Sequence, residues 1–334
     1  MAHVTVPPAW IVAQARQLLR RRGHAWLLLG PSGLGQYSLS LELARAWLCD
    51  QPGPDGACGQ CPSCHAIEVR GHTDLCVLMP ETVMLALGWP LAEKAQKEID
   101  DKSRKPSKEI RVDAMRDAVD FAQRTSGRGR GKVVLVYPAE RMNHVTANAL
   151  LKTLEEPAGD LHFVLASEAA HQLLPTIRSR CQSHTMSWPT QQEAAAWLQG
   201  QGVEETVVLQ VLRAAGGRPD DALDYAQAGG HAKVWPSLPK ALARGDVSVL
   251  ANWTPSQAVD ALLKLCHDLL AVKAGAAPRF FEPCDLPPPT SFAALAAWSH
   301  ELVRTARTVE HPFNAGLMLE ALVSQAHSAL NSRA

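Results

Sequence analysis

The sequence has no excess of charge of either sign. Lysine and arginine together number 33, and aspartate and glutamate also number 33, so the formal net charge at pH 7 is zero. Proteins that bind nucleic acid on their own usually carry a basic excess. The balance therefore argues against an autonomous nucleic-acid-binding protein, although it leaves room for local basic patches.

Long apolar runs are missing as well. No stretch approaches the ~20 apolar residues that a membrane-spanning helix needs, and the N-terminus lacks the basic segment and apolar run of a signal peptide. We therefore expect a cytoplasmic protein that makes no membrane contact. In that compartment the eight cysteines are better explained as metal ligands or core residues than as disulfides.

Segments with strand-like and helix-like patterns alternate along the first half of the chain. Apolar runs typical of buried strands occur at 25–29, 75–79, 132–137 and 161–166, and helical spacing occurs at 10–22, 37–48, 113–123 and 146–155. Such alternation predicts an α/β domain with a mostly parallel sheet covered by helices. We assign this domain to residues 1–187.

After residue 189 the strand signals vanish and only helical patterns remain. A small helical unit is predicted over 191–229, Trp235 and Pro239 mark a junction, and long amphipathic helices are predicted at 255–274, 291–308 and 314–330. We therefore predict a small helical domain over 188–230 and a larger helical domain over 231–334. The apolar helices of the larger domain serve either its own core or assembly with other chains.

Two charged segments interrupt the α/β region. Residues 81–109 form an insertion, and 93–111 is dense in mixed charge, which is typical of a solvated or disordered segment. Residues 124–132 form a basic, glycine-rich turn. Such a turn is either an exposed loop or a contact for a phosphate backbone.

Gly30 to Tyr37 has the outline of a phosphate-binding loop. An intact loop reads G-x-x-x-x-G-K-[ST] between a strand and a helix, and Gly30 and Gly35 stand where this pattern needs glycine. However, Gln36 replaces the lysine that reaches the phosphates, and Tyr37 replaces the hydroxyl residue that holds Mg²⁺. Without both, the charge of a transferring phosphoryl group is not neutralised. The segment is either a nucleotide-binding loop that has lost its activity or a glycine-rich turn of similar appearance.

Four cysteines lie close together in the sequence, at Cys49, Cys58, Cys61 and Cys64. The turn-forming residues 50–57 allow the first to fold back on the others. This pattern suits a tetrahedral zinc site, and a closed four-cysteine site supports the fold rather than catalysing a reaction.

Three alternatives for the cysteines are weaker. Covalent haem attachment through C-x-x-C-H requires export, an iron–sulfur run lacks its fourth cysteine at Glu68, and a redox dithiol leaves two cysteines unexplained. The scattered cysteines outside the group are expected to be small buried apolar residues: Cys76, Cys181, Cys266 and Cys284.

Two further motifs make the pattern specific. They are the segment NALLKTLEEP at 148–157 and the tripeptide Ser179-Arg180-Cys181. With the altered loop and the four cysteines, in this order, they make the chain similar to the bacterial clamp-loader subunits of DNA polymerase III. The resemblance covers nearly the whole chain and is weakest in 81–109 and at the C-terminal end. It implies an AAA+-type α/β domain with a zinc module inserted at 49–64, a small helical domain and a helical C-terminal collar.

The chain departs from the ATP-hydrolysing motor subunits of that family at several points. Besides the loop changes, Tyr137 and Pro138 follow a strand where motors carry two acidic residues, and Asp220 stands where a sensing arginine is expected, with Arg218 close by. The resemblance therefore implies a non-catalytic component of the DNA-directed DNA polymerase III holoenzyme that binds no ATP. An active motor subunit with an atypical phosphate loop is the alternative. A free-standing, zinc-dependent nucleic-acid-binding protein is a third interpretation.

Arg180 keeps the Ser-Arg-Cys context of the family. The resemblance implies an arginine finger supplied in trans to the ATP of a neighbouring subunit, whereas the simpler interpretation is a surface ion pair. It also implies partners: tau/gamma motor subunits and a delta subunit in a hetero-pentamer, and through that complex the sliding clamp and primed DNA.

Overall fold

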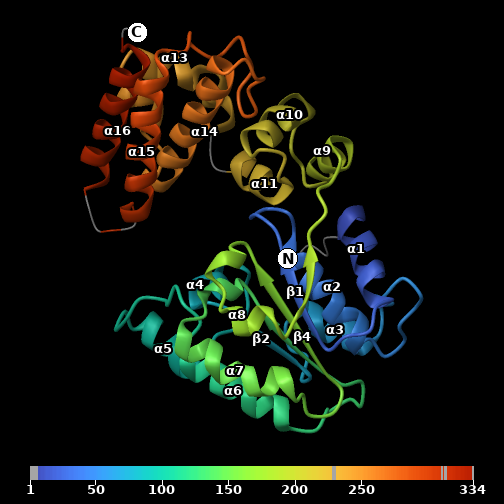
Figure 1. Cartoon of the computed structure of the whole chain (residues 1–334). Coiled ribbons are helices and arrows are strands. Elements are labelled where there is room, and N and C mark those ends of the chain that lie inside the picture. The colour runs from blue at the N-terminus through green and yellow to red at the C-terminus, as the bar shows by residue number, and fades with distance from the viewer. Residues whose placement is uncertain (1–6, 228–230, 310, 312–313, 333–334) are drawn as a thin grey trace. The chain divides into compact units, whose positions relative to one another are not determined.

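The computed structural model describes residues 7–227, 231–309, 311 and 314–332 (Figure 1). The chain divides into two compact units, one ending at Glu193 and the other beginning at Ala194. None of the helices built by the described residues is long and apolar enough to cross a bilayer. The six N-terminal residues, on which the prediction about a signal peptide partly depends, lie outside the described residues.

A parallel sheet forms the centre of the first unit. Among the described residues five strands pair in the order β2-β3-β4-β1-β5. Their bounds are Ala25–Leu29 for β1, Leu75–Leu78 for β2, Lys132–Val136 for β3, Leu161–Ser167 for β4 and Gln182–Thr185 for β5. The central strands are buried along nearly their whole length, which is typical of a parallel sheet covered on both faces.

Helices cover the two faces of this sheet. The alternation along β3 separates them: Val133 packs with α2 and α3, whereas Val134 and Val136 pack with α6 and α7. The helices of the first unit are α1 (Ala9–Leu19), α2 (Gln36–Leu48), α3 (Pro62–Glu68), α4 (Glu81–Ala86), α5 (Glu93–Asp100), α6 (Val112–Gln123), α7 (His144–Glu155) and α8 (Pro175–Arg178). The predicted fold class is confirmed.

Strand β5 was not among the predicted strands. Its sequence is polar, and only His184 of its four residues is buried. It pairs with β1 at the edge of the sheet. Because an edge strand with a polar surface shows no apolar run, its place depends on main-chain pairing that the sequence pattern does not reveal.

The charged insertion 81–109 is folded, which corrects the expectation of disorder, while its charge-dense part from residue 93 onward stays largely exposed, as expected of a solvated segment. It contains α4 and α5, and Arg104 connects them. The Arg104 guanidinium donates to both carboxylate oxygens of Glu81, at 2.5 and 2.7 Å, and its Nε donates to Glu98 Oε2 at 2.7 Å. The Arg104 hydrogen bonds hold the pKa of the Glu81 carboxyl below its usual value. Three of the charged side chains of the insertion are therefore paired with one another.

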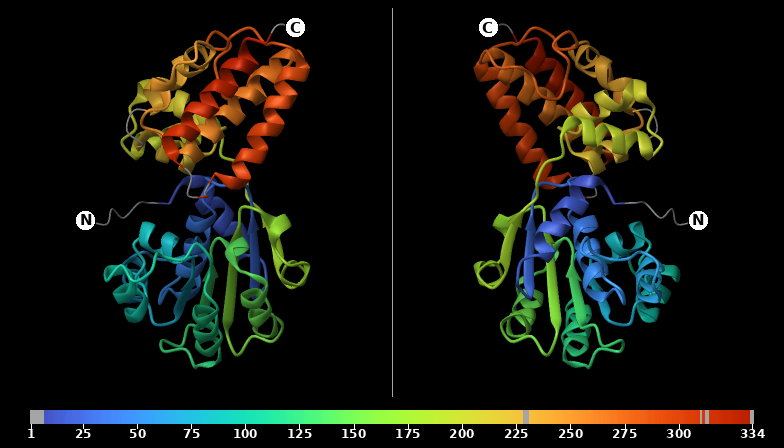
Figure 2. Two further views of the ribbon diagram at one scale, coloured as in Figure 1. Left: turned by 90° about the vertical axis from the view of Figure 1, so that its left-hand side faces the viewer. Right: turned by 90° about the vertical axis from the view of Figure 1, so that its right-hand side faces the viewer.

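The second unit is entirely helical among its described residues. Figure 2 shows its long helices α14, α15 and α16 side by side. The bounds are α9 (Gln191–Gly200), α10 (Glu205–Ala214), α11 (Pro219–Gln227), α12 (His231–Val234), α13 (Leu238–Ala243), α14 (Pro255–Lys273), α15 (Phe292–Thr308) and α16 (Ala315–Leu330). A capping box between Thr254 and Gln257 sets the start of α14.

The predicted junction at Trp235 is part of a core. Trp235 is buried and stacks on Phe281, with ring centroids 4.4 Å apart. One cluster of buried side chains joins α9 to α11 and another joins α13 to α16. The predicted boundary after residue 230 lies at residues 228–230, outside the described residues. The division into three domains stays a prediction.

Candidate functional site

The four cysteines predicted as metal ligands lie together in the first unit. Cys49 follows α2, Cys61 caps the start of α3, and Cys64 lies in the first turn of that helix. All four sulfur atoms are within 4.8 Å of one another. The Cys49 sulfur is 3.5 Å from that of Cys58 and 3.7 Å from those of Cys61 and Cys64. Tetrahedral zinc with Zn–S bonds of about 2.3 Å sets its sulfur atoms about 3.8 Å apart, so the geometry fits that ion.

Backbone amides point at these sulfur atoms. The Cys58 amide donates to Cys49 Sγ at 3.3 Å, and the Cys61 and Cys64 amides donate to Cys58 Sγ and Cys61 Sγ, each at 3.4 Å. Hydrogen bonds from the amides of Gln60 and Cys61 lower the pKa of the Cys58 thiol to about 6. Burial instead raises the pKa of the Cys49 and Cys64 thiols. A metal that binds thiolates must therefore displace protons from the buried pair.

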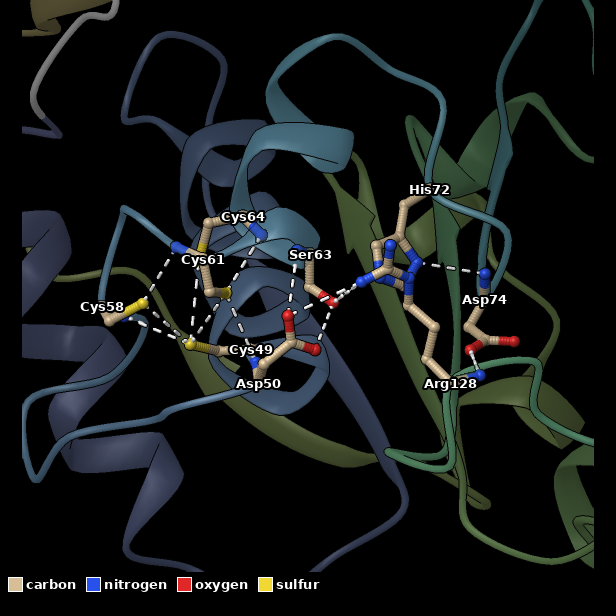
Figure 3. A network of polar contacts seen from close by, with 9 residues as sticks. All are labelled: Cys49, Asp50, Cys58, Cys61, Ser63, Cys64, His72, Asp74 and Arg128. Carbon is tan, nitrogen blue, oxygen red and sulfur yellow. Dashed lines mark hydrogen bonds and ion pairs between the residues drawn. The ribbon is translucent and has the colours of Figure 1, made fainter.

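A polar network connects this cluster to the basic turn (Figure 3). The Asp50 carboxylate accepts from the Ser63 hydroxyl at 2.7 Å and from the Ser63 amide at 3.2 Å. Arg128 Nη1 donates to Ser63 Oγ at 3.0 Å and lies 3.6 Å from Asp50 Oδ2. The Ser63 hydrogen bond lowers the pKa of Asp50. The residues beside the ligands are thus fixed by partners of their own, as metal sites require.

Part of the basic turn is held in place by hydrogen bonds to its backbone and to Lys132, and part of it is exposed to solvent. The Asp74 carboxylate accepts from the Gly127 amide at 2.7 Å and from the Arg128 amide at 2.9 Å. Lys132 is buried, and its ammonium donates to carbonyls at the end of α6, including that of Ala122 at 2.5 Å. The Arg130 side chain is exposed. The turn is therefore a capped loop that leaves part of its charge at the surface.

The altered phosphate loop has the predicted strand–loop–helix context. Gly30 follows β1, and Gln36 is the first residue of α2. The Gln36 side chain is buried, and its Nε2 donates to the Gly30 carbonyl at 2.9 Å and to the Pro31 carbonyl at 2.6 Å. Gly35 has a φ of 89°, and a Cβ there would lie 2.8 Å from Ile11 Cδ1. The loop therefore keeps the left-handed backbone that requires glycine at position 35, while the Gln36 side chain occupies two of the loop carbonyls.

An aromatic cluster occupies the neighbouring position. The rings of Tyr37 and Tyr137 have centroids 5.7 Å apart. Trp89 Nε1 donates to the Tyr37 hydroxyl at 2.8 Å, and the Tyr137 hydroxyl donates to Glu168 Oε1 at 2.9 Å. Burial raises the pKa of Tyr37. Sequence reasoning missed Trp89 because it comes from the charged insertion, where no pattern pointed to this loop.

Arg180 is held by a partner that sequence reasoning also missed. It follows α8, and its Nε donates to Glu155 Oε1 at 2.5 Å while Nη2 bonds the same carboxylate. Its Nη1 donates to the Thr176 carbonyl at 2.9 Å. The Arg180 side chain is 30% exposed. Glu155 lies in the NALLKTLEEP segment, so the two motifs that gave the resemblance meet in this ion pair.

The structure also places Arg218 and the four cysteines that lie outside the cluster. Arg218, near the expected sensing arginine, pairs with Asp221 at 2.7 Å in the second unit. Of the scattered cysteines, Cys266 is buried and Cys76 and Cys181 are partly buried, but Cys284 is exposed, so the expectation of a buried residue is wrong there.

Comparisons with known proteins agree with these observations. The family model described as DNA polymerase III, delta subunit, matches residues 12–189, which is more than half of the chain. The chain is 38% identical to the DNA polymerase III subunit delta-prime of Pseudomonas aeruginosa over 201 residues, or 60% of this chain and 54% of that protein. It is 32% identical to the DNA polymerase III subunit tau of Escherichia coli over 256 residues, or 75% of this chain and 33% of that protein.

A solved structure shares the fold. The Thermotoga maritima protein related to the DNA polymerase III gamma subunit aligns with a TM-score of 0.50 and 17% identity, over 96% of this chain and 99% of that one. The chain spans about half the length of the delta-prime relatives it matches. The predicted resemblance to the bacterial clamp-loader subunits of DNA polymerase III is confirmed, and the relatives named delta-prime make it specific to that subunit.

Proposed function

The chain belongs to the family described as DNA polymerase III, delta subunit, and on this premise we propose that it is a non-catalytic clamp-loader subunit of DNA polymerase III. Such a subunit lies in the cytoplasm and helps a complex use ATP to load the sliding clamp on primed DNA. Its partners are tau/gamma motor subunits and a delta subunit in a hetero-pentamer. The helices α14 to α16 are the candidate collar for that assembly.

The side chain of Gln36 carries the non-catalytic part of the proposal. A phosphate loop works because its lysine and its hydroxyl–Mg²⁺ pair neutralise phosphate charge. The amide of Gln36 is uncharged, and both of its described hydrogen bonds go to loop carbonyls. Tyr37 and Tyr137 place packed rings where a motor has a hydroxyl and a carboxylate. Nucleotide would have to break these contacts and would gain neither the loop lysine nor the Mg²⁺ ligand in return.

We assign zinc to the cysteine cluster and give it a structural role. The sulfur spacing fits a four-coordinate ion, and a site with four protein ligands leaves no open position for a substrate. Asp50, Ser63 and Arg128 then hold the ligand-bearing segments in place. We expect the ion to stabilise this part of the first unit.

Arg180 is proposed as the residue that acts on another chain. A guanidinium stays protonated and can stabilise the γ-phosphate of ATP in a neighbouring subunit as it transfers. Glu155 and the Thr176 carbonyl fix its orientation at a partly exposed place. This subunit would then have lost its own catalytic site and kept the arginine that completes another.

A motor subunit with an atypical loop is the competing candidate, favoured by the match to tau over a larger share of this chain. The test is a reconstituted complex in which every motor subunit lacks its loop lysine. We expect the complex to assemble stoichiometrically with this chain and to show no ATP hydrolysis above background. Hydrolysis that depends on this chain would support the motor alternative, and failure to assemble would contradict the clamp-loader assignment.

A further inference from the structure

A surface cavity of about 450 Å³ lies in the first unit, between the loop that joins Cys49 to Cys58 and the basic turn at 124–132. One wall is the Pro52-Gly53-Pro54 turn, between the first two cysteines, and another is Gly129-Arg130. Trp47, His162 and Arg20 also line it. Its volume falls within the range of about 300–1,000 Å³ that small-ligand sites occupy.

Two stacked rings form part of the lining. Trp47 at the end of α2 and His162 on β4 lie with ring centroids 4.4 Å apart and an interplanar angle of 18°. Both side chains are partly exposed. Burial lowers the pKa of His162, so the ring is neutral at neutral pH. Because the two rings already face each other, a further flat ring stacks on an outer face of the pair, on the side that lines the cavity.

The charges at the cavity are not used by the fold. Within the described part of the chain, the side chains of Arg20 and Arg130 make no hydrogen bond or ion pair, and both are exposed. Arg128, two residues from Arg130, is instead paired with Asp50 and Ser63. The lining also holds one carboxylate, that of Asp160. Two guanidinium groups and one carboxylate leave the cavity with a net positive charge.

We propose that this cavity binds a segment of single-stranded nucleic acid, with a base on the Trp47–His162 stack and adjacent phosphates at Arg20 and Arg130. Stacking on aromatic rings combined with cationic contacts to the backbone is the general way in which proteins hold single strands. An acidic peptide would use the arginines but would leave the stacked rings without a specific role. The assignment rests partly on the proposed function, in which the complex acts on primed DNA.

The contact is weak by itself. With zero net charge over the whole chain, there is little long-range attraction for nucleic acid. Within the proposed complex, the cavity adds one local contact with nucleic acid to the contacts that the other subunits make. It also depends on the cysteine cluster, because Cys49 and Cys58 fix the two ends of the loop that forms one wall.

The test uses the full chain alone, without nucleotide or partner subunits. A fluorescently labelled oligo-dT is titrated at several salt concentrations, with an acidic peptide and a DNA duplex as competitors. Two phosphate contacts on a single strand predict a slope of about −1.4 for log K against log salt. Arg20→Gln and Arg130→Gln should each reduce its magnitude by about 0.7. Arg124→Gln is the matched control, because Arg124 is an exposed arginine of the same turn that does not line the cavity.

The stacking surface is tested by Trp47→Phe and Trp47→Leu, with melting temperature as the check on folding. Phenylalanine should keep most of the affinity, whereas leucine should weaken binding about tenfold. No measurable binding at low salt, an equal effect of Arg124→Gln, or displacement by the peptide but not by unlabelled oligo-dT would overturn the proposal. None of these results bears on ATP hydrolysis, so the proposed function is tested separately.

Discussion

The phosphate loop and the cysteine cluster lie at opposite ends of the same helix, α2, and have opposite fates. At its start, Gln36 donates to carbonyls of its own loop, and Tyr37 packs into an aromatic cluster. At its end, Cys49 meets three other sulfur atoms at distances that suit a shared metal ion. One site uses its polar groups internally, while the other leaves its ligand atoms directed at a common centre. A motif outline therefore indicates a working site only when the side chains in it remain available to a ligand.

The largest expected effect comes from breaking the cysteine cluster. Cys58→Ser should lower zinc content well below one per chain and destabilise the protein by about 4 kcal/mol, because loss of a structural metal is among the severe changes. That corresponds to a fall in melting temperature of roughly 8–16 °C. Metal analysis and thermal unfolding measure both. Cys284→Ser, at the exposed cysteine outside the cluster, is the control, and full zinc content in Cys58→Ser would contradict the ligand assignment.

The pH dependence of zinc affinity should sharpen the same point. Burial keeps the Cys49 and Cys64 thiols protonated at neutral pH, so metal binding must release at least two protons, and affinity should rise at least about 100-fold per pH unit. Below pH 6 the Cys58 thiol, with a pKa of about 6, also becomes protonated, and the dependence should steepen. Competition with a chromogenic chelator at several pH values measures it. An affinity independent of pH between 6.5 and 7.5 would show that thiols are not the ligands.

Arg180→Ala should have an intermediate effect that appears only in the complex. Folding and zinc content should stay near normal because a partly exposed ion pair contributes about 0–1 kcal/mol. DNA-stimulated ATP hydrolysis by the reconstituted complex should fall by about one third if this arginine serves one of three motor sites. Arg178→Ala is the control two residues away, and Glu155→Gln tests whether the partner orients the guanidinium. Equal rates for wild type and Arg180→Ala would make it an ordinary surface residue.

Gln36→Lys should have the smallest effect on function. It restores the loop lysine, yet Tyr37 and Tyr137 still provide no ligand for Mg²⁺. We expect no ATP hydrolysis and a modest loss of stability, about 1–3 kcal/mol, since the fitted amide with its two hydrogen bonds is replaced by a charged ammonium at a buried position. A sensitive phosphate-release assay and thermal unfolding measure these quantities. Recovery of hydrolysis by this single change would mean that the aromatic cluster does not disable the site.

Local patterns in the sequence predicted the features that depend on neighbours along the chain. The central strands follow from buried apolar runs, and the metal cluster follows from the close spacing of its cysteines. Pairs that are distant in sequence could not be predicted in this way. Trp89 reaches Tyr37 across 52 positions and Arg180 meets Glu155 across 25, and neither contact leaves a periodic signal. The same limit applies to β5, whose polar edge position comes from pairing with β1.

Calorimetric titration of the isolated full chain with Mg·ATP tests the central claim most directly. A parallel titration of the metal-free protein with zinc shows that the same preparation is competent to bind. We predict about one zinc per chain and no heat from Mg·ATP at tens of micromolar protein. A clear single-site isotherm for Mg·ATP would show that Gln36 and the tyrosines do not block the loop, and it would contradict the assignment of a non-catalytic subunit.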